Sequence, residues 1–121
     1  MERLTKSEEP VMQLLWKLKK AFVKEIIAQL PEPKPPYNTI SSIIRILEEK
    51  GMVDHQTFGK THQYYPIVSK AEYSKSLFKY LMSDYLEGSY AHLMSFIVQD
   101  DKLSAQEIKE LQNMIKKNKN E

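Results

Sequence analysis

The chain has 121 residues, of which 41% are hydrophobic and 28% charged, and its formal net charge is +2. This length suits one small domain, or one domain with a dependent appendage, and it excludes a large catalytic cleft. No apolar run approaches the roughly 20 residues that span a bilayer, the first six residues lack the apolar core of a secretory signal, and cysteine is absent. We therefore expect a cytoplasmic protein without disulfides or thiolate chemistry.

The first quarter of the chain is typical of two short helices. Thr5 and Glu8 have the spacing of a capping box, in which a threonine and a glutamate three residues later satisfy each other's backbone amides. This pair predicts a helix over about 6–18. Apolar residues at helical spacing over 22–30 predict a second helix, which a proline-rich connector at 31–36 ends.

A third helix and a hairpin follow. Asn38 predicts the helix cap, and Gly51 predicts the end, because glycine tolerates the positive φ found just beyond a helix. Two β-like runs, 53–57 and 62–66, flank a linker that contains Gly59 and therefore predict a hairpin. Three helices followed by a hairpin within some 60 residues are the layout of a winged helix. The apolar stripe of the third helix consists of Ile40, Ile43, Ile44 and Leu47.

The back half of the chain is typical of three more helices. Two further capping boxes, 69–72 and 104–107, predict helix starts. The first of these helices runs to about Leu86, and the last ends before a polar tail at 116–121. A shorter helix over about 89–98 lies between them.

The predicted fold class is mainly α with a small β-hairpin wing. We expect a winged helix-turn-helix DNA-binding domain over 1–67 and a helical dimerisation domain over 68–121. Three helices in some 50 residues can barely support a core of their own, so their surplus apolar residues predict packing against a second copy. The candidate dimerisation residues are Leu77, Phe78, Leu81, Leu93, Phe96, Ile97, Ile108 and Leu111.

The face of the third helix opposite its apolar stripe carries short polar groups and one arginine. Asparagine can pair with adenine, arginine with guanine or phosphate, and hydroxyls with either, so this face suits a major groove. Basic and hydroxyl groups at the hairpin tip can reach phosphate. The whole charge excess falls in residues 1–66, but it is small. The candidate DNA-binding residues are Asn38, Thr39, Ser41, Ser42 and Arg45 on the helix, with Lys60, Thr61 and His62 on the hairpin.

Other functions have weaker support in the sequence. His55, His62 and His92 show no catalytic or metal-ligand spacing, and Asp54 and His55 should point to opposite faces of a strand. We therefore expect no enzyme activity, no metal site and no cofactor. The alternative to DNA binding is a winged-helix module for protein–protein assembly, whose polar helix face docks a partner without sequence-specific DNA contacts.

The chain resembles the BlaI/MecI/CopY family of penicillinase-type repressors. The resemblance implies a winged-helix homodimer that binds a palindromic operator on double-stranded DNA and blocks transcription. In the β-lactam branch, the signal passes through a membrane-bound sensor metalloprotease, and the repressor is cleaved in its dimerisation segment. The stretches that carry the likeness are Leu4–Trp16, Asn38–Gly51, His62–Pro66 and Asp100–Leu111.

The chain departs from the family pattern at two points. The copper-responsive branch uses cysteine pairs, so the absence of cysteine excludes copper sensing through thiolates. The bond cleaved in the β-lactam branch joins an asparagine to a phenylalanine, and the corresponding pair here is Ser95–Phe96. Cleavage at this bond and a response to antibiotics are therefore hypotheses that the resemblance suggests.

Overall fold

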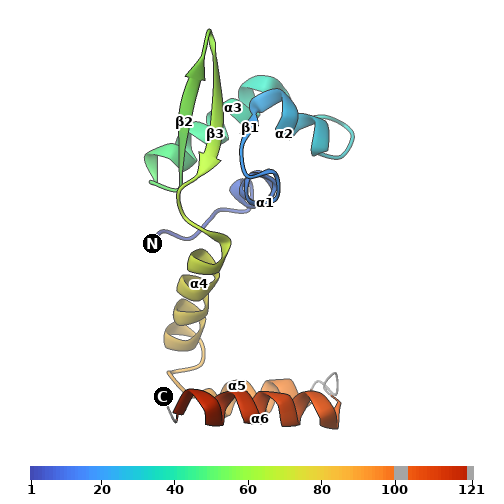
Figure 1. The fold of residues 1–121 in the computed structure, drawn as a ribbon, viewed down its shortest axis with the longest axis vertical. Coiled ribbons are helices and arrows are strands. Elements are labelled where there is room, and N and C mark those ends of the chain that lie inside the picture. The colour runs from blue at the N-terminus through green and yellow to red at the C-terminus, as the bar shows by residue number, and fades with distance from the viewer. Residues whose placement is uncertain (100–103, 120–121) are drawn as a thin grey trace. The chain divides into compact units, whose positions relative to one another are not determined.

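The computed structural model describes residues 1–99 and 104–119 (Figure 1). None of the helices within these ranges is long and apolar enough to cross a membrane. The predicted fold class is confirmed: helices dominate, and a β-hairpin forms the wing. The elements in chain order are α1 (Glu8–Leu18), β1 (Ala21–Phe22), α2 (Val23–Gln29), α3 (Tyr37–Glu49), β2 (Val53–Phe58), β3 (Thr61–Pro66), α4 (Lys70–Asp84), α5 (Tyr90–Gln99) and α6 (Ala105–Lys119).

The first capping box is present, although the helix starts later than predicted. Glu8 Oε1 accepts the Thr5 N–H at 2.8 Å, and Thr5 Oγ1 accepts the Glu8 N–H at 3.3 Å. The regular helix α1 begins only at Glu8, because the residues between the two partners form a turn. The boxes at 69–72 and 104–107 make the same reciprocal bonds before α4 and α6. Helix α6 continues to Lys119, so the prediction of a polar tail from 116 is wrong for 116–119.

The sheet has one strand more than the sequence predicted. Ala21 and Phe22 form the short strand β1, which pairs antiparallel with β3 opposite Tyr64 and Gln63. The strand order is therefore β1-β3-β2. The second helix begins at Val23, one residue later than predicted, because the Phe22 backbone is extended at φ −80° and ψ 157°.

Helix α3 starts two residues earlier than the sequence predicted. Its N-cap is Pro36, whose carbonyl accepts the N–H groups of Thr39 and Ile40. The prediction of Asn38 as the cap is therefore wrong, and Asn38 lies in the first turn. The expected helix end is confirmed, since Gly51 follows α3 with a φ of 77°.

The wing is a tight hairpin whose strands are longer than predicted. Strands β2 and β3 pair out to Phe58 and Thr61, which leaves only Gly59 and Lys60 to turn the chain. Gly59 has a φ of 61°, which L side chains rarely adopt. Figure 1 shows the hairpin projecting from the helices of its unit.

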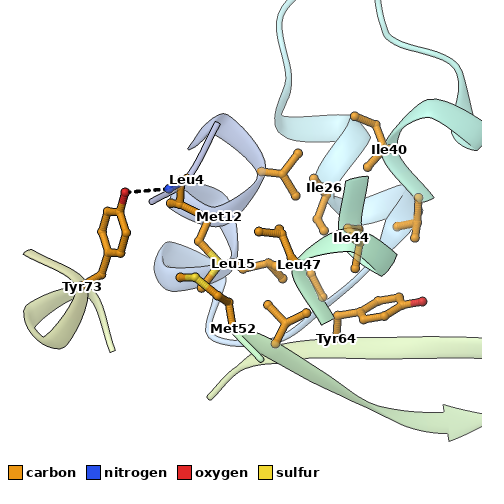
Figure 2. Packing of buried hydrophobic residues seen from close by; sticks show 14 residues of the cluster. Leu4, Met12, Leu15, Ile26, Ile40, Ile44, Leu47, Met52, Tyr64 and Tyr73 are labelled. Atoms are coloured by element: carbon orange, nitrogen blue, oxygen red, sulfur yellow. Dashed lines mark hydrogen bonds between the residues drawn. The ribbon is translucent and has the colours of Figure 1, made fainter. Parts of the chain in front are cut away.

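One hydrophobic cluster joins the three N-terminal helices to the sheet. Figure 2 shows Leu15 of α1, Ile26 of α2 and Leu47 of α3 packed together beside Tyr64 of β3. The three aliphatic side chains are completely buried. Burial of each stabilises the fold by about 1.5–3 kcal/mol. This packing orients α3 with its apolar stripe inward and its polar face outward.

The chain forms two compact units, Met1–Leu77 and Phe78–Glu121. The first unit extends beyond the wing because the start of α4 packs on its core. The Tyr73 hydroxyl accepts the Leu4 N–H at 3.0 Å (Figure 2). In the second unit, Met82 and Leu86 are buried, each with 5% of its surface exposed.

Candidate DNA interface

The outward face of α3 presents the predicted polar residues to solvent. Ile40, Ile44 and Leu47 are buried on the opposite side. The structure therefore places the five helix candidates on one accessible surface, with four of them exposed and one half-buried. The exposed residues are Asn38, Thr39, Ser42 and Arg45, and the half-buried residue is Ser41.

Arg45 lies along its own helix. Its Nε donates to the Ser41 carbonyl oxygen at 3.4 Å, and its Nη2 donates to Ser42 Oγ at 3.5 Å. Both distances are at the long limit for hydrogen bonds, so both bonds are weak. The guanidinium can therefore exchange these bonds for a base edge or a phosphate at little cost.

The predicted wing residues are also exposed. Lys60 occupies the turn, and Thr61 Oγ1 donates to the Phe58 carbonyl oxygen at 2.9 Å. His62 Nδ1 lies 3.2 Å from Thr57 Oγ1 across the hairpin. These bonds hold the Thr61 and His62 side chains on the wing.

The wing and the start of α3 border one hollow of about 300 Å³. Thr61 and His62 line it from the wing, Tyr37 from α3 and Lys24 from α2. Of the predicted DNA-binding residues, only Thr61 and His62 line this hollow, and the α3 residue that borders it is Tyr37. Sequence reasoning missed Lys24 and Tyr37. A cap predicted at Asn38 left Tyr37 outside the helix, and nothing in the sequence placed α2 beside the wing.

A partly buried ion pair anchors the far end of α3. Lys50 Nζ lies 2.7 Å from Glu8 Oε1 and 3.9 Å from Glu2 Oε2. Burial raises the pKa of the Glu8 carboxyl, but Lys50 and the hydrogen bonds from Thr5 together outweigh it, and the net pKa falls below its ordinary value of 4.5. Glu8 is therefore a carboxylate at neutral pH, and it fixes α3 relative to α1.

A second polar cluster lies where α3 meets the base of the wing. His55 Nδ1 hydrogen-bonds with Glu48 Oε1, and Asp54 Oδ1 accepts the His55 N–H at 2.7 Å. The expectation that the Asp54 and His55 side chains point to opposite faces is wrong for their polar ends, because a carboxylate oxygen of Asp54 lies within 4.8 Å of a ring nitrogen of His55. Burial raises the pKa of the Tyr64 phenol, and the Glu48 carboxylate raises it further. Local spacing could not reveal this cluster, because the fold brings Glu48 from another element.

The dimerisation candidates leave much apolar surface uncovered in the second unit. Leu77 differs from the others because it packs on the core of the first unit. Helix α5 buries none of its side chains. The exposed candidates are Phe78 at 39%, Leu81 at 41% and Phe96 at 51%, and the half-buried ones are Leu93, Ile97, Ile108 and Leu111.

The candidate cleavage pair is accessible on α5. Ser95 is exposed, and the ring of Phe96 stacks on that of His92 with centroids 4.8 Å apart. The segment Asp100–Leu103, which carries part of the family resemblance, lies outside the described residues.

A family model described as "Penicillinase repressor" matches residues 4–117. The chain belongs to the penicillinase repressor family. Members of this family are repressors and not enzymes, so the predictions of family and of a non-enzymatic protein are confirmed.

Individual relatives agree with this assignment. The methicillin resistance regulatory protein MecI of Staphylococcus aureus is 29% identical over 94% of either chain. The penicillinase repressor of Bacillus licheniformis is 24% identical over 98% of this chain and 93% of its own.

Solved structures support the winged-helix fold. The DNA-binding domain of the repressor BlaI superposes with a TM-score of 0.51 at 25% identity, covering 60% of this chain and 94% of that domain. The RosR protein of H. salinarum has a TM-score of 0.52 over 97% of this chain and 94% of its own, and at 13% identity it shows the fold alone.

Proposed function

We propose that this protein is a homodimeric transcriptional repressor that binds a palindromic operator on double-stranded DNA. The observation that carries the proposal is the outward face of α3, where Asn38, Thr39, Ser42 and Arg45 are exposed above a closed core. The names of the relatives, which include a penicillinase repressor and the DNA-binding domain of BlaI, point the same way.

In this mechanism α3 enters the major groove. Arg45 leaves its weak bonds to Ser41 and Ser42 and contacts guanine or phosphate, and Asn38 contacts a base edge. Lys60 on the wing contacts phosphate, with Thr61 and His62 beside it. These wing contacts set the position of the protein on the duplex, and α3 supplies the base contacts that select the sequence.

The second unit holds two copies together in the same proposal. Its exposed apolar residues, Phe78, Leu81 and Phe96 among them, would be covered by a partner copy. The two winged-helix domains of a dimer bind two half-sites of the operator. Because the domains are linked, binding of the first raises the effective concentration of the second at its half-site. In this proposal residues 1–67 bind DNA and residues 68–121 hold the dimer, with the start of α4 packed on the first unit.

Release of the operator would follow cleavage at Ser95–Phe96 by a membrane-bound sensor metalloprotease. The exposure of both residues on α5 supports access for a protease. A cut there separates α6 from the rest of the second unit and weakens the dimer. The affinity for the operator then falls, because the two winged-helix domains are no longer linked.

A salt titration of DNA binding tests the proposal. The protein would first be used to select its preferred duplex from a random pool. The dissociation constants of this selected duplex and of a scrambled duplex would then be measured at increasing salt concentrations. Phosphate contacts make affinity fall steeply with salt, and base contacts make the selected duplex bind more tightly at every salt concentration. A protein–protein assembly module would show neither the steep fall of DNA affinity with salt nor the preference for the selected duplex.

A further inference from the structure

Three metal-ligating side chains meet where the end of α3 packs on β2. The ligand atoms of Glu48, Asp54 and His55 all lie within 4.8 Å of one another. Glu48 comes from the last turns of α3, whereas Asp54 and His55 are consecutive residues of β2. The cluster therefore joins two elements within the first unit.

The donor set suits a divalent transition metal. One imidazole nitrogen and two carboxylate oxygens are ligands that Zn²⁺ accepts, and the ion is commonly held by three protein groups and water. The two carboxylates bring negative charge to the site, which a divalent cation balances. Glu48 also lies near the C-terminal end of α3, where the helix dipole adds negative potential.

The ligand atoms already lie close to the separations that the ion requires, since all are within 4.8 Å of one another. Ligand atoms at about 2.0–2.2 Å from Zn²⁺ are about 3.3 Å apart around a tetrahedron. His55 Nδ1 and Glu48 Oε1 share a hydrogen bond, and a bound ion would take the place of the shared proton. The side chains of His55 and Glu48 are 30% and 31% exposed, so an ion and its completing waters can enter.

Neighbouring rings hold the imidazole in place. The His62 ring centroid lies 4.2 Å from that of His55, and the Tyr64 centroid lies 5.6 Å away. Tyr64 is only 5% exposed and belongs to the hydrophobic core. Such packing fixes the ring orientation before the ion arrives, which lowers the entropic cost of binding.

We propose that Glu48, Asp54 and His55 form a binding site for one Zn²⁺-class divalent ion. The ion would crosslink the end of α3 to the base of the wing, with water completing its coordination. This proposal concerns metal binding alone and does not depend on the DNA-binding function.

Isothermal titration of the full-length, chelator-treated protein with ZnCl₂ tests the site. The wild type should bind one ion per chain, and its melting temperature should rise with added Zn²⁺. His55→Gln and Asp54→Asn should each weaken binding by roughly tenfold or more, since even indirect metal contacts carry that weight. His92→Gln is the matched control, because His92 lies on α5 outside the cluster, and its affinity should equal that of the wild type.

The two cluster variants protect the test against a folding artefact. Asp54 is exposed, so Asp54→Asn should keep the melting temperature of the metal-free wild type while losing the response to Zn²⁺. The proposal is overturned if the wild type takes up no Zn²⁺ or if His55→Gln binds as tightly as the wild type. It is also overturned if His92→Gln is the variant that loses the ion.

Discussion

Lys50 Nζ lies 2.7 Å from Glu8 Oε1, and this ion pair joins the start of α1 to the residue that caps the end of α3. The side chain of Glu8 is 4% exposed and that of Lys50 is 16% exposed. Each charge was costly to remove from water, so each depends on the other once the chain has folded.

Replacing Lys50 with methionine should destabilise the fold. The substitution leaves the buried Glu8 carboxylate without its cation, which should lower the free energy of unfolding by about 2–4 kcal/mol. Urea unfolding measures the change. Lys17→Met removes an exposed ammonium on α1 and should alter stability by less than about 0.5 kcal/mol. Equal losses in the two variants would show that the ion pair has no special role.

The same ion pair makes the free energy of unfolding depend on pH. The pKa of Glu8 is lower in the folded protein than its ordinary value of 4.5, so its contribution is complete above that pH and is lost as the pH falls through the folded pKa. Glu8→Gln should therefore be less stable than the wild type at neutral pH, and the difference should vanish in strong acid. Urea midpoints at a series of pH values measure it. A difference that stays constant with pH would contradict the assignment.

Arg45 and Lys60 should have different effects on DNA binding. Arg45→Ala should cost roughly 1–3 kcal/mol of affinity for the selected duplex only, as expected for a base contact. Lys60→Ala should weaken binding to all duplexes alike and reduce the salt slope by about one unit. Lys109→Ala, on α6, serves as a control and should change neither quantity. Unchanged affinity in both test variants would mean that another surface contacts DNA.

The helices of the first unit were largely predictable because their apolar residues recur at helical spacing. Three residues of the α3 stripe, Ile40, Ile44 and Leu47, are buried as their period indicated, and Ile43 is partly buried. The predictions were wrong at some ends of elements, because the backbone conformation of a single residue decides where a helix begins. Asn38 is a good cap by residue type, but Pro36 is already extended and starts α3 first.

Contacts between elements were beyond the reach of local patterns. Strand β1 has two residues, too few to show an alternating pattern, and it exists because β3 pairs with it. Glu48 and His55 are seven positions apart on different elements, and only the packing of α3 on the sheet brings them together. The exposed polar face of α3 was predictable, since it is simply the side opposite the buried stripe.

Phe96→Asp should split the proposed dimer. A carboxylate in the apolar contact between copies would be buried without a partner, at a cost of several kcal/mol. Sedimentation at micromolar concentration should show a dimer for the wild type and a monomer for the variant. Gln106→Glu adds the same charge at an exposed position of α6 and should remain dimeric. A monomeric wild type would refute dimerisation through this unit.

Cleavage at Ser95–Phe96 should accompany induction. Helix α5 is short and buries none of its side chains, so it should open locally at low cost and admit a protease. Mass spectrometry of the protein from cells treated with a cell-wall antibiotic should find fragments ending at Ser95 and beginning at Phe96. If the target genes are expressed while only the full-length chain is present, release does not proceed by proteolysis.

Trp16 is the single tryptophan of the chain, and it lies against the start of α4. Its indole Nε1 donates to the Val68 carbonyl oxygen at 2.8 Å, and its ring centroid lies 5.7 Å from that of Tyr73. Because an indole that loses a hydrogen bond and gains water changes its emission, the fluorescence of this one residue reports whether the start of α4 stays docked on α1. The protein therefore has an intrinsic fluorescent probe for the contact between α1 and the start of α4.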